Sequence, residues 1–355
     1  MSSVEYMQRA LALAEKGRGE TRTNPLVGAV IVKDGRIIAE GFHRAFGADH
    51  AEVDALQRAI EPAQGAALYV NLEPCAHFGK TPPCVEAIRQ AGIARVIAAM
   101  TDPNPQVNGA GMQKLREAGI EVTLGVCEEE ARRLNAPYLK YIRTGLPFVT
   151  LKIAQTLDGK IADNAGNSKW ISSEASRRRV HELRVHHDAV LVGANTVRLD
   201  NPELTSHGLG RDPLRLVVAG HDGIGANAKI VAGALAERTI LCTPKSGNAA
   251  QGETQNLWQI RGADGQVDLR ELLLQAASNG VASILVEGGQ SIFSQFIESK
   301  LVDKFLIVVA PKLLGDGLNS VQFVTERSIA AALNLEILNI SLLDGDVWIE
   351  AFPRD

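Results

Sequence analysis

The sequence has little cysteine, few aromatic residues and no surplus of charge of either sign. Four cysteines in 355 residues argue against a disulfide framework and favour a reducing compartment. The 37 basic and 41 acidic residues leave a net charge of −4, so no basic surplus indicates a nucleic-acid partner. Aromatic residues make up 5% of the chain, which favours alternating strands and helices over an aromatic-rich sandwich.

Long apolar runs are also missing. No stretch of about 18 apolar residues occurs, so we expect no membrane-spanning helix. Residues 1–19 carry charges throughout and lack the apolar core of a signal peptide. Ser2 and Glu5 have the spacing of a capping box, which predicts an amphipathic helix that Gly17 can end. These absences together predict a cytoplasmic protein.

The chain is long enough for two domains with separate cores. Strand-like and helix-like segments alternate up to about residue 126, which predicts a mixed α/β unit with helices on both faces of a sheet. The charged segment 127–145 has helical periodicity, and we expect it to bridge the two domains. The predicted domains are 1–145 and 146–355.

The second half also has the pattern of an α/β unit. Its strand candidates include 148–154 at the start and 189–197 further on. Helices are expected at about 173–187, 268–279 and 291–300, and a final pair of strands around Asp344-Gly345.

One histidine and two cysteines form the most distinctive pattern. His50 opens HAEVDA, and Cys75 and Cys84 enclose a loop in NLEPCAHFGKTPPC (71–84). Imidazole and thiolate are ligands that zinc prefers, and three of them leave a position for water, as in a catalytic site. Cys84 follows two prolines at an expected helix start, where the helix dipole favours a thiolate. We therefore expect one Zn²⁺ per chain, held by His50, Cys75 and Cys84.

Glu52 lies two positions after His50. On a regular helix such positions point about 200° apart, so both side chains can face one metal only at the first turn. Asp49 is the expected cap that places His50 there. Zinc would make hydroxide available near neutral pH, and Glu52 would carry protons to the ring nitrogen and the leaving ammonia. This pattern matches zinc nucleoside and nucleobase deaminases, although eight residues rather than two separate the cysteines.

These motifs, together with TNPLVGAVIV (23–32) and TDPNPQVNGAG (101–111), resemble the bifunctional deaminase/reductase family of riboflavin biosynthesis. The resemblance covers about residues 1–145 and implies a cytidine-deaminase-like mixed-sheet domain. It places the zinc ligands on His50, Cys75 and Cys84 and the proton shuttle on Glu52. It also implies substrate contacts at Asn24, His43, His77, Lys80 and Asn104. For Asn24 and Asn104, each of which precedes a proline, turn formation is the alternative.

The second half lacks the G-x-G-x-x-G spacing of a Rossmann dinucleotide site. Another candidate phosphate cradle is LVEGGQSIF (285–293), in which two glycines stand between an expected strand and an expected helix. Free N–H groups at a helix start can bind phosphate. A tight turn is the alternative explanation for the glycine pair.

The stretches VTLKIAQTLDGKIA (149–162), SKWISS (168–173), LVGANTVRLDNPELT (191–205) and LVEGG resemble the reductase domain of the same family. The resemblance covers most of 146–352 and implies a dihydrofolate-reductase-like fold that uses NADPH. It implies cofactor contacts at Ala154, Trp170, Thr196, Asp200, Gly289, Gln290, Ser291, Ile292, Phe293, Ser294 and Gln295. It implies substrate contacts at Ser168, Arg184, Leu204, His207 and Glu287, with Lys152 close to the reaction centre. No contact is assigned to Gly220 or His221.

Physical roles follow for two of these residues. Arg184 can place its guanidinium on a ribose phosphate, with a charged helix face as the alternative. Trp170 can stack on the cofactor, with core packing as the alternative.

The resemblance implies two reactions on ribosylaminopyrimidine phosphates. The first is zinc-dependent deamination of 2,5-diamino-6-(5-phosphoribosylamino)pyrimidin-4-one. The second is NADPH reduction of the ribosyl group of 5-amino-6-(5-phosphoribosylamino)uracil to a ribityl group. It also implies a homo-oligomer, a dimer or tetramer, without nucleic-acid or membrane partners. The alternatives are a nucleic-acid deaminase with an accessory domain and a structural zinc module in which His77 is the fourth ligand.

Overall fold

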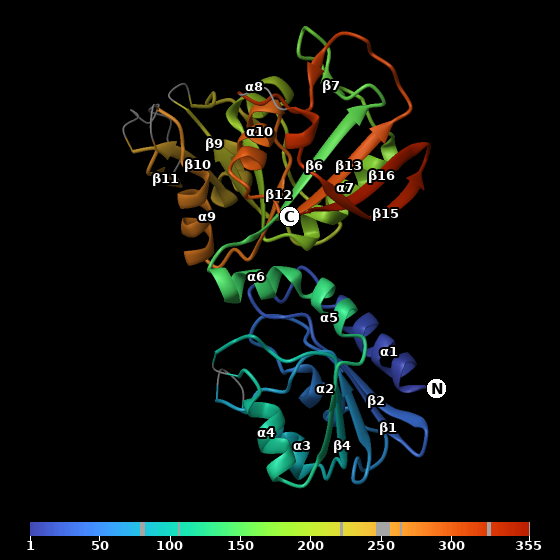
Figure 1. The fold of residues 1–355 in the computed structure, drawn as a ribbon. Helices are drawn as coiled ribbons and strands as arrows, with labels where there is room; N and C mark the ends of the chain where they lie inside the picture. Colours follow the sequence, from blue (N-terminus) through green and yellow to red (C-terminus); the bar gives the residue numbers. More distant parts are fainter. Residues whose placement is uncertain are drawn as a thin grey trace. The chain divides into compact units, whose positions relative to one another are not determined.

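The computed structural model describes residues 1–78, 82–105, 107–220, 223–245, 256–262, 265–324 and 328–354. The chain divides into two compact units, Met1–Gly145 and Leu146–Asp355. Each unit has its own β-sheet and its own hydrophobic core, and both are α/β in class, as the sequence predicted (Figure 1). Among the described residues, no helix has both the length and the apolar character that crossing a membrane requires.

The first unit is built on a five-stranded sheet in the order β2-β1-β3-β4-β5. The first three strands in that order pair antiparallel, and the rest continue in parallel. The strands are β1 (Gly28–Lys33), β2 (Arg36–Phe42), β3 (Ala67–Val70), β4 (Arg95–Ala98) and β5 (Glu121–Leu124).

Helices α1 (Ser3–Glu15) and α2 (Ala51–Gln57) pack against glycines of the β1–β2 hairpin. A Cβ at Gly28 would lie 2.1 Å from a carbonyl oxygen of α1, and a Cβ at Gly41 would lie 2.3 Å from a backbone nitrogen of α2. Gly41 pairs with Ala29, the residue that follows Gly28. Because successive strand residues point to opposite faces, α1 and α2 cover opposite faces of the sheet.

The capping box expected at the start of α1 is present. The Ser2 side chain accepts from the Glu5 N–H, and the Glu5 side chain accepts from the Ser2 N–H. The helix ends at Glu15, two residues before Gly17.

The charged segment after β5 belongs to the first unit and runs to its last residue, Gly145. It forms two helices, α5 (Glu128–Leu134) and α6 (Ala136–Thr144), separated at Asn135. The buried Asn135 amide accepts from the Leu26 N–H at 2.7 Å and donates to the Leu26 carbonyl at 3.0 Å. The helical segment is broken at Asn135, whose side chain bonds to the backbone of Leu26, two residues before strand β1. The other helices of the unit are α3 (Cys84–Gln90) and α4 (Ala110–Glu117).

The second unit is built on a nine-stranded sheet in the order β11-β10-β9-β8-β12-β6-β13-β16-β15, with β11 and β15 at its edges (Figure 1). The strands from β11 to β13 in this order are parallel, and β16 and β15 are antiparallel. The strands are β6 (Phe148–Thr156), β8 (Ala189–Gly193), β9 (Leu214–Val218), β10 (Thr239–Pro244), β11 (Leu257–Ile260), β12 (Ser283–Val286), β13 (Lys304–Ala310), β15 (Leu335–Leu343) and β16 (Asp346–Pro353).

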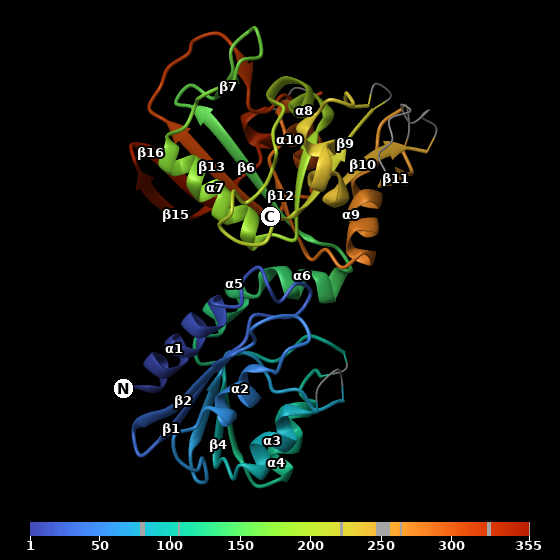
Figure 2. The same ribbon diagram turned by 180° about the vertical axis from the view of Figure 1, so that it is seen from behind.

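Helices α7 (Glu174–His186) and α10 (Gln290–Glu298) cover opposite faces of this sheet. In Figure 1 α10 lies in front of the strands, and in Figure 2 α7 does. The packing agrees. Ala154 of β6 belongs to the hydrophobic cluster that contains Val180 of α7, whereas Ile153 belongs to the cluster that contains Phe293 of α10. The remaining helices are α8 (Ala194–Asp200) and α9 (Leu269–Ser278), with 3-10 turns at Lys229–Val231, Gly233–Arg238 and Ile329–Ala331.

The structure differs from the sequence-based expectations in three places. The expected strand over 189–197 ends at Gly193, and Ala194 begins helix α8. Strand β11 was not predicted. The two-stranded sheet of β7 (Lys160–Ala162) and β14 (Leu318–Asn319) was not predicted either. Strands this short contain too few residues to reveal an alternation of apolar and polar side chains.

We expect Gly41→Ala to destabilise the first unit by about 1–3 kcal/mol, since its Cβ would meet the backbone of α2 rather than a movable side chain. Urea unfolding of the full chain measures the loss. The matched control is Gly225→Ala, where a Cβ meets nothing within 4 Å and φ is not positive. Equal stability of the two variants would show that α2 does not pack this closely on β2.

Candidate active sites

The structure brings His50, Cys75 and Cys84 together at one point of the first unit. One donor atom from each lies within 4.8 Å of the others. The His50 Nδ1 atom is 3.2 Å from the Cys84 sulfur and 3.5 Å from the Cys75 sulfur. Cys84 is the first residue of α3, as predicted, and its N–H points at the Cys75 sulfur at 3.4 Å. Two sulfurs and an imidazole are a donor set that fits zinc.

The site favours a thiolate. Hydrogen bonding from Cys84, followed by that from His50, holds the pKa of the Cys75 thiol well below its ordinary value. The hydrogen bond to Cys75 in turn raises the pKa of His50. A thiolate is the form in which cysteine binds a metal, so the protein environment supports metal binding at this point.

Glu52 lies beside the three donors but is not one of them. It sits in the first turn of α2 and is 3% exposed. Burial raises the pKa of its carboxyl group to about 7, although the nearby His50 opposes this. A carboxyl group poised near neutrality can both accept and donate a proton, which is the property of a general acid–base.

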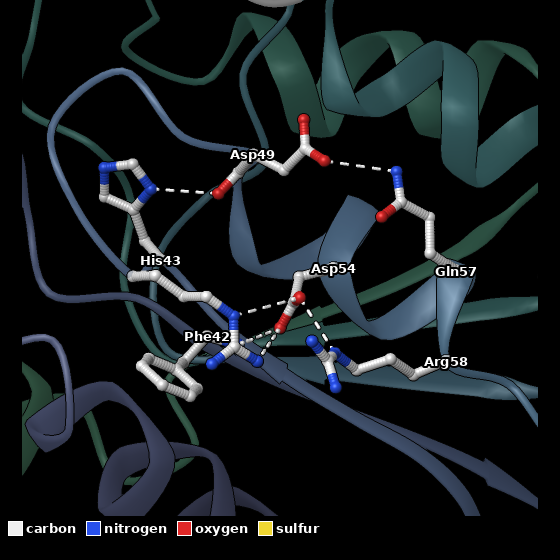
Figure 3. Close-up of polar contacts among 7 residues, drawn as sticks. Phe42, His43, Asp49, Asp54, Gln57 and Arg58 are labelled. Carbon is white, nitrogen blue, oxygen red and sulfur yellow. Dashed lines mark hydrogen bonds and ion pairs between the residues drawn. The ribbon is translucent and has the colours of Figure 1, made fainter.

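The chain entering α2 is held by side chains rather than by the expected Asp49 cap. His50 itself is the N-cap residue and Asp49 precedes it, so the capping role assigned to Asp49 is wrong. Figure 3 shows the Asp49 carbonyl oxygen facing the His43 ring at 3.0 Å, and its carboxylate accepting from Gln57 at 3.1 Å. The other His43 nitrogen is 3.1 Å from the Asn24 amide. His43 and Asn24 thus lie next to the start of α2, where His50 is located.

A second anchor fixes α2 to the strand before it. The Asp54 carboxylate, 7% exposed, accepts from the Phe42 N–H at 3.1 Å, from Arg44 at 3.0 Å and from Arg58 at 2.9 Å (Figure 3). Because Asp54 is one turn after His50, these bonds fix the end of α2 that carries the metal ligand.

Sequence reasoning missed Glu73, two residues before Cys75. Its buried carboxylate accepts from the backbone N–H groups of Asp102, Gly109, Gly111 and Met112 at 2.9–3.3 Å. These bonds satisfy N–H groups at the start of α4. A Cβ at Gly111 would lie 2.0 Å from the carbonyl oxygen of Pro74, so α4 packs directly on the backbone before Cys75.

The other positions implied by the resemblance differ in what they contact. Asn104 donates its backbone N–H to Asp102, whose carboxylate also accepts from Tyr138. The Nδ1 atom of His77 is buried and has no hydrogen-bond partner among the described residues. Lys80 lies outside the described residues.

The second unit contains a cavity of about 890 Å³. It opens where β6, β8, β9 and β12 end, at the carboxyl edge of the parallel strands, which is the usual place for a ligand site in such sheets. Among the residues that the sequence implied, its lining includes Lys152, Ala154, Ser168, Trp170, Arg184, Thr196, Asp200, Leu204, His207, Glu287, Gly289, Gln290, Ser291, Ile292, Phe293 and Gln295. Ser294 does not line it, because its buried hydroxyl donates to Gln290 and accepts from Gln322.

A buried charge cluster forms one wall of the cavity. Arg184 binds Glu287 through two bonds of 2.7 and 3.1 Å and also donates to the Thr205 carbonyl at 3.0 Å. Burial alone would raise the pKa of Glu287, but Arg184 and Lys152 hold it below its ordinary value. Lys152 has a lowered pKa, mainly because it is buried. Arg184 thus lines the cavity while its guanidinium is bonded to the Glu287 carboxylate.

The start of α10 forms another wall. Its N-cap residue is Gly289, and a Cβ there would meet only the Thr196 hydroxyl, at 3.9 Å. Glycine leaves the first N–H groups of this nine-residue helix accessible, and Gly288 to Ser291 line the cavity. An open helix start at the carboxyl edge of a parallel sheet fits the phosphates of a dinucleotide.

Several lining residues had no assigned role. Gly220 lies on the cavity although no contact was expected there, whereas His221 lies outside the described residues. Arg177 lines it too and lies over the Trp170 ring at 4.3 Å from the centroid. His181 stacks on His207. Arg177, His181 and Arg184 lie at i, i+4 and i+7 of one helix and therefore share a face. Once Arg184 was expected at the site, this spacing could have identified the other two.

Comparison with protein families gives two matches. A model described as the RibD C-terminal domain matches residues 147–349. A model described as the cytidine and deoxycytidylate deaminase zinc-binding region matches residues 1–100, which contain His50, Cys75 and Cys84.

Whole-chain relatives match both units. The riboflavin biosynthesis protein RibD of Aquifex aeolicus is 43% identical and covers 97% of this chain and 96% of its own. The Escherichia coli protein of that name is 41% identical, with 89% of each covered. Among solved structures, Acinetobacter baumannii RibD has a TM-score of 0.89 at 37% identity. The Thermotoga maritima diaminohydroxyphosphoribosylaminopyrimidine deaminase/5-amino-6-(5-phosphoribosylamino)uracil reductase has 0.89 at 39% identity. Each of the two covers 99% of this chain and is itself 99% covered. This agreement along both units shows that the chain belongs to the RibD family of bifunctional riboflavin-biosynthesis enzymes.

Proposed function

We propose that residues 1–145 deaminate 2,5-diamino-6-(5-phosphoribosylamino)pyrimidin-4-one. Residues 146–355 then reduce the ribosyl group of 5-amino-6-(5-phosphoribosylamino)uracil to a ribityl group with NADPH. The family supports this pair of reactions. The observation that carries the proposal is the convergence of His50, Cys75 and Cys84 beside the buried carboxyl group of Glu52.

In the first unit, His50, Cys75 and Cys84 would hold one Zn²⁺, which supplies the Lewis acidity that makes water nucleophilic near neutral pH. Glu52 accepts the proton of the attacking water and returns it to the departing nitrogen. A carbon–oxygen bond forms at the amine-bearing ring carbon, the carbon–nitrogen bond breaks, and ammonia leaves. The substrate is oriented by Asn24, His43, His77, Lys80 and Asn104.

In the second unit, the cavity binds both cofactor and substrate. NADPH supplies the hydride when it is bound, and the start of α10 would hold its phosphates. The cofactor positions are Ala154, Trp170, Thr196, Asp200, 289–293 and Gln295. The ribosyl group lies against Lys152 and Glu287, with Ser168, Arg184, Leu204 and His207 completing its surroundings. The residues that line the cavity would orient the reacting carbon toward the cofactor, which is the main protein contribution to hydride transfer.

The two alternative functions have less support. A nucleic-acid deaminase would need a basic surface, whereas this chain has a net charge of −4. A structural zinc module would need four protein ligands. Within the described part of the chain, the group of metal-binding side chains contains the three predicted ligands and not His77. Three ligands leave a position for water, which favours the catalytic interpretation.

We further propose a cytoplasmic homo-oligomer, a dimer or tetramer. The low cysteine content supports a reducing compartment. The edge strand β15 supports self-association, because Ile337, Ile340 and Leu342 on it are 55%, 58% and 76% exposed. Exposed apolar edge strands are usually covered in soluble proteins.

We expect Glu52→Gln to reduce ammonia release at least about 100-fold, because an amide cannot carry the proton. NADPH oxidation with the deaminated substrate should stay unchanged, since the second unit is a separate compact body. Both rates are measured on the full chain. Glu86→Gln, an exposed change on α3, is the control and should keep both activities. Loss of both activities in a folded Glu52→Gln chain would contradict the assignment of the two reactions to separate units.

We expect one zinc per chain by metal analysis, falling below about 0.1 in Cys84→Ser, because a hydroxyl is a much poorer zinc ligand than a thiolate. Cys127→Ser, at a half-buried thiol outside the donor group, should keep its zinc. A strong chelator should abolish ammonia release and leave NADPH oxidation intact. Full zinc content in Cys84→Ser would contradict the assigned ligands.

A further inference from the structure

Cys75 is the predicted metal ligand whose backbone belongs to neither a helix nor a strand. Cys84 is the first residue of α3 and His50 is the N-cap residue of α2, so helix geometry fixes both. Residues 73–76 lie beyond the end of β3 in irregular backbone. Other contacts must therefore hold the Cys75 sulfur at its distance of 3.5 Å from the His50 ring.

Helices α3 and α4 hold the backbone of this segment. The Cys75 carbonyl accepts from the Val85 N–H of α3 at 3.3 Å. The Pro74 carbonyl packs on Gly111 of α4, where a Cβ would lie 2.0 Å from the carbonyl oxygen. Two consecutive carbonyl groups thus contact two different helices, which limits how the segment can rotate.

Lys114 of α4 binds the next carbonyl group with its side chain. Its Nζ atom donates to the carbonyl oxygen of Ala76 at 2.9 Å. Gly111 and Lys114 are three positions apart on α4, so both face the segment that carries Cys75. A charged donor forms a stronger hydrogen bond than a neutral one. The ammonium group therefore fixes the carbonyl that directly follows the sulfur-bearing residue.

Glu73 fixes the other end of the segment. Its carboxylate, 4% exposed, accepts from the Asp102 N–H and from three N–H groups at the start of α4, at 2.9–3.3 Å. These bonds reach both ends of the stretch 102–109, which carries the predicted substrate residue Asn104. One buried side chain therefore ties that stretch to the segment 73–76.

We propose that Lys114 and Glu73 are positioning residues of the deaminase reaction, which hold Cys75 in place for the metal from the two ends of its segment. Each acts through the backbone that bears the sulfur donor. The inference rests on the proposed zinc-dependent deamination and adds to it two side chains that belong neither to the donor group nor to the predicted substrate contacts. Residues that support metal ligands in this way typically change metal affinity or activity about 10- to 100-fold when replaced.

The first measurement is the zinc affinity of the full chain, by competition with a chromogenic chelator. Lys114→Met removes the ammonium donor at an exposed helix position and keeps a flexible side chain. It should raise the Kd for Zn²⁺ about 10-fold or more. Lys114→Arg keeps a charged donor and should stay within about threefold of the unmodified chain. Arg116→Met removes the same charge from another exposed position of α4 and is the matched control, with an unchanged Kd.

A spectroscopic signature separates positioning of the ligand from general stability. Co²⁺ bound in place of Zn²⁺ absorbs visible light, and its ligand-field and thiolate charge-transfer bands depend on the geometry of the ligands. Lys114→Met should shift these bands, whereas Arg116→Met should not. Glu73→Gln should shift them further, because an amide NH₂ group would face N–H donors where a carboxylate oxygen now accepts.

Unchanged zinc affinity and unchanged cobalt bands in both Lys114→Met and Glu73→Gln would overturn the proposal. An equal loss of affinity in Arg116→Met would overturn it too, because the effect would then follow from charge alone. If Glu73→Gln does not fold, the Lys114 variants decide, since they change an exposed side chain.

Measuring ammonia release on the same proteins separates this inference from the proposed function. If the unmodified chain binds zinc and deaminates the diamino substrate while the variants keep their zinc affinity, only the positioning role is wrong. If the unmodified chain binds zinc but releases no ammonia from that substrate, the deaminase function fails. A lower zinc affinity in Lys114→Met would even then support the role of Lys114 in holding Cys75.

Discussion

Both sites depend on helices that begin just past the carboxyl ends of parallel strands. In the first unit α3 follows β3 and begins at Cys84, while in the second unit α8 and α10 follow β8 and β12. A helix start presents N–H groups with no partner inside the helix, together with the positive end of its dipole. A thiolate ligand and a phosphate group are both anionic, so the same backbone arrangement suits either of them.

The two sites treat a buried carboxyl group in opposite ways. Among the described residues no cationic side chain forms a hydrogen bond with Glu52, and burial moves its pKa to about 7, where it can exchange protons. Glu287 is partly buried in the cavity wall and is bonded to Arg184, which holds its pKa below the ordinary value and keeps it ionised. The first arrangement gives a carboxyl group that can exchange protons near neutral pH, whereas the second holds a permanent charge in the wall of the cavity.

The zinc donors could be predicted because each lies in a short motif whose chemistry is local. Residue type identified all three, and an expected helix start supported His50 and Cys84. Glu73 could not be predicted, since its partners lie 29 to 39 residues later in the chain. His181 was not predicted for a related reason. Its partner His207 is 26 positions away, and the sequence of α7, which carries His181, reads as a charged, solvent-exposed helix face.

The close contact between Gly111 and the Pro74 carbonyl has a consequence for how this protein can vary. A side chain at position 111 would displace the backbone of Pro74, the residue before Cys75. Helix α4 carries none of the metal-binding side chains, yet it constrains where one of them lies. Position 111 of α4 must therefore remain glycine for the neighbouring metal-binding site to keep its geometry, while an exposed position such as Gln113 has no such restriction.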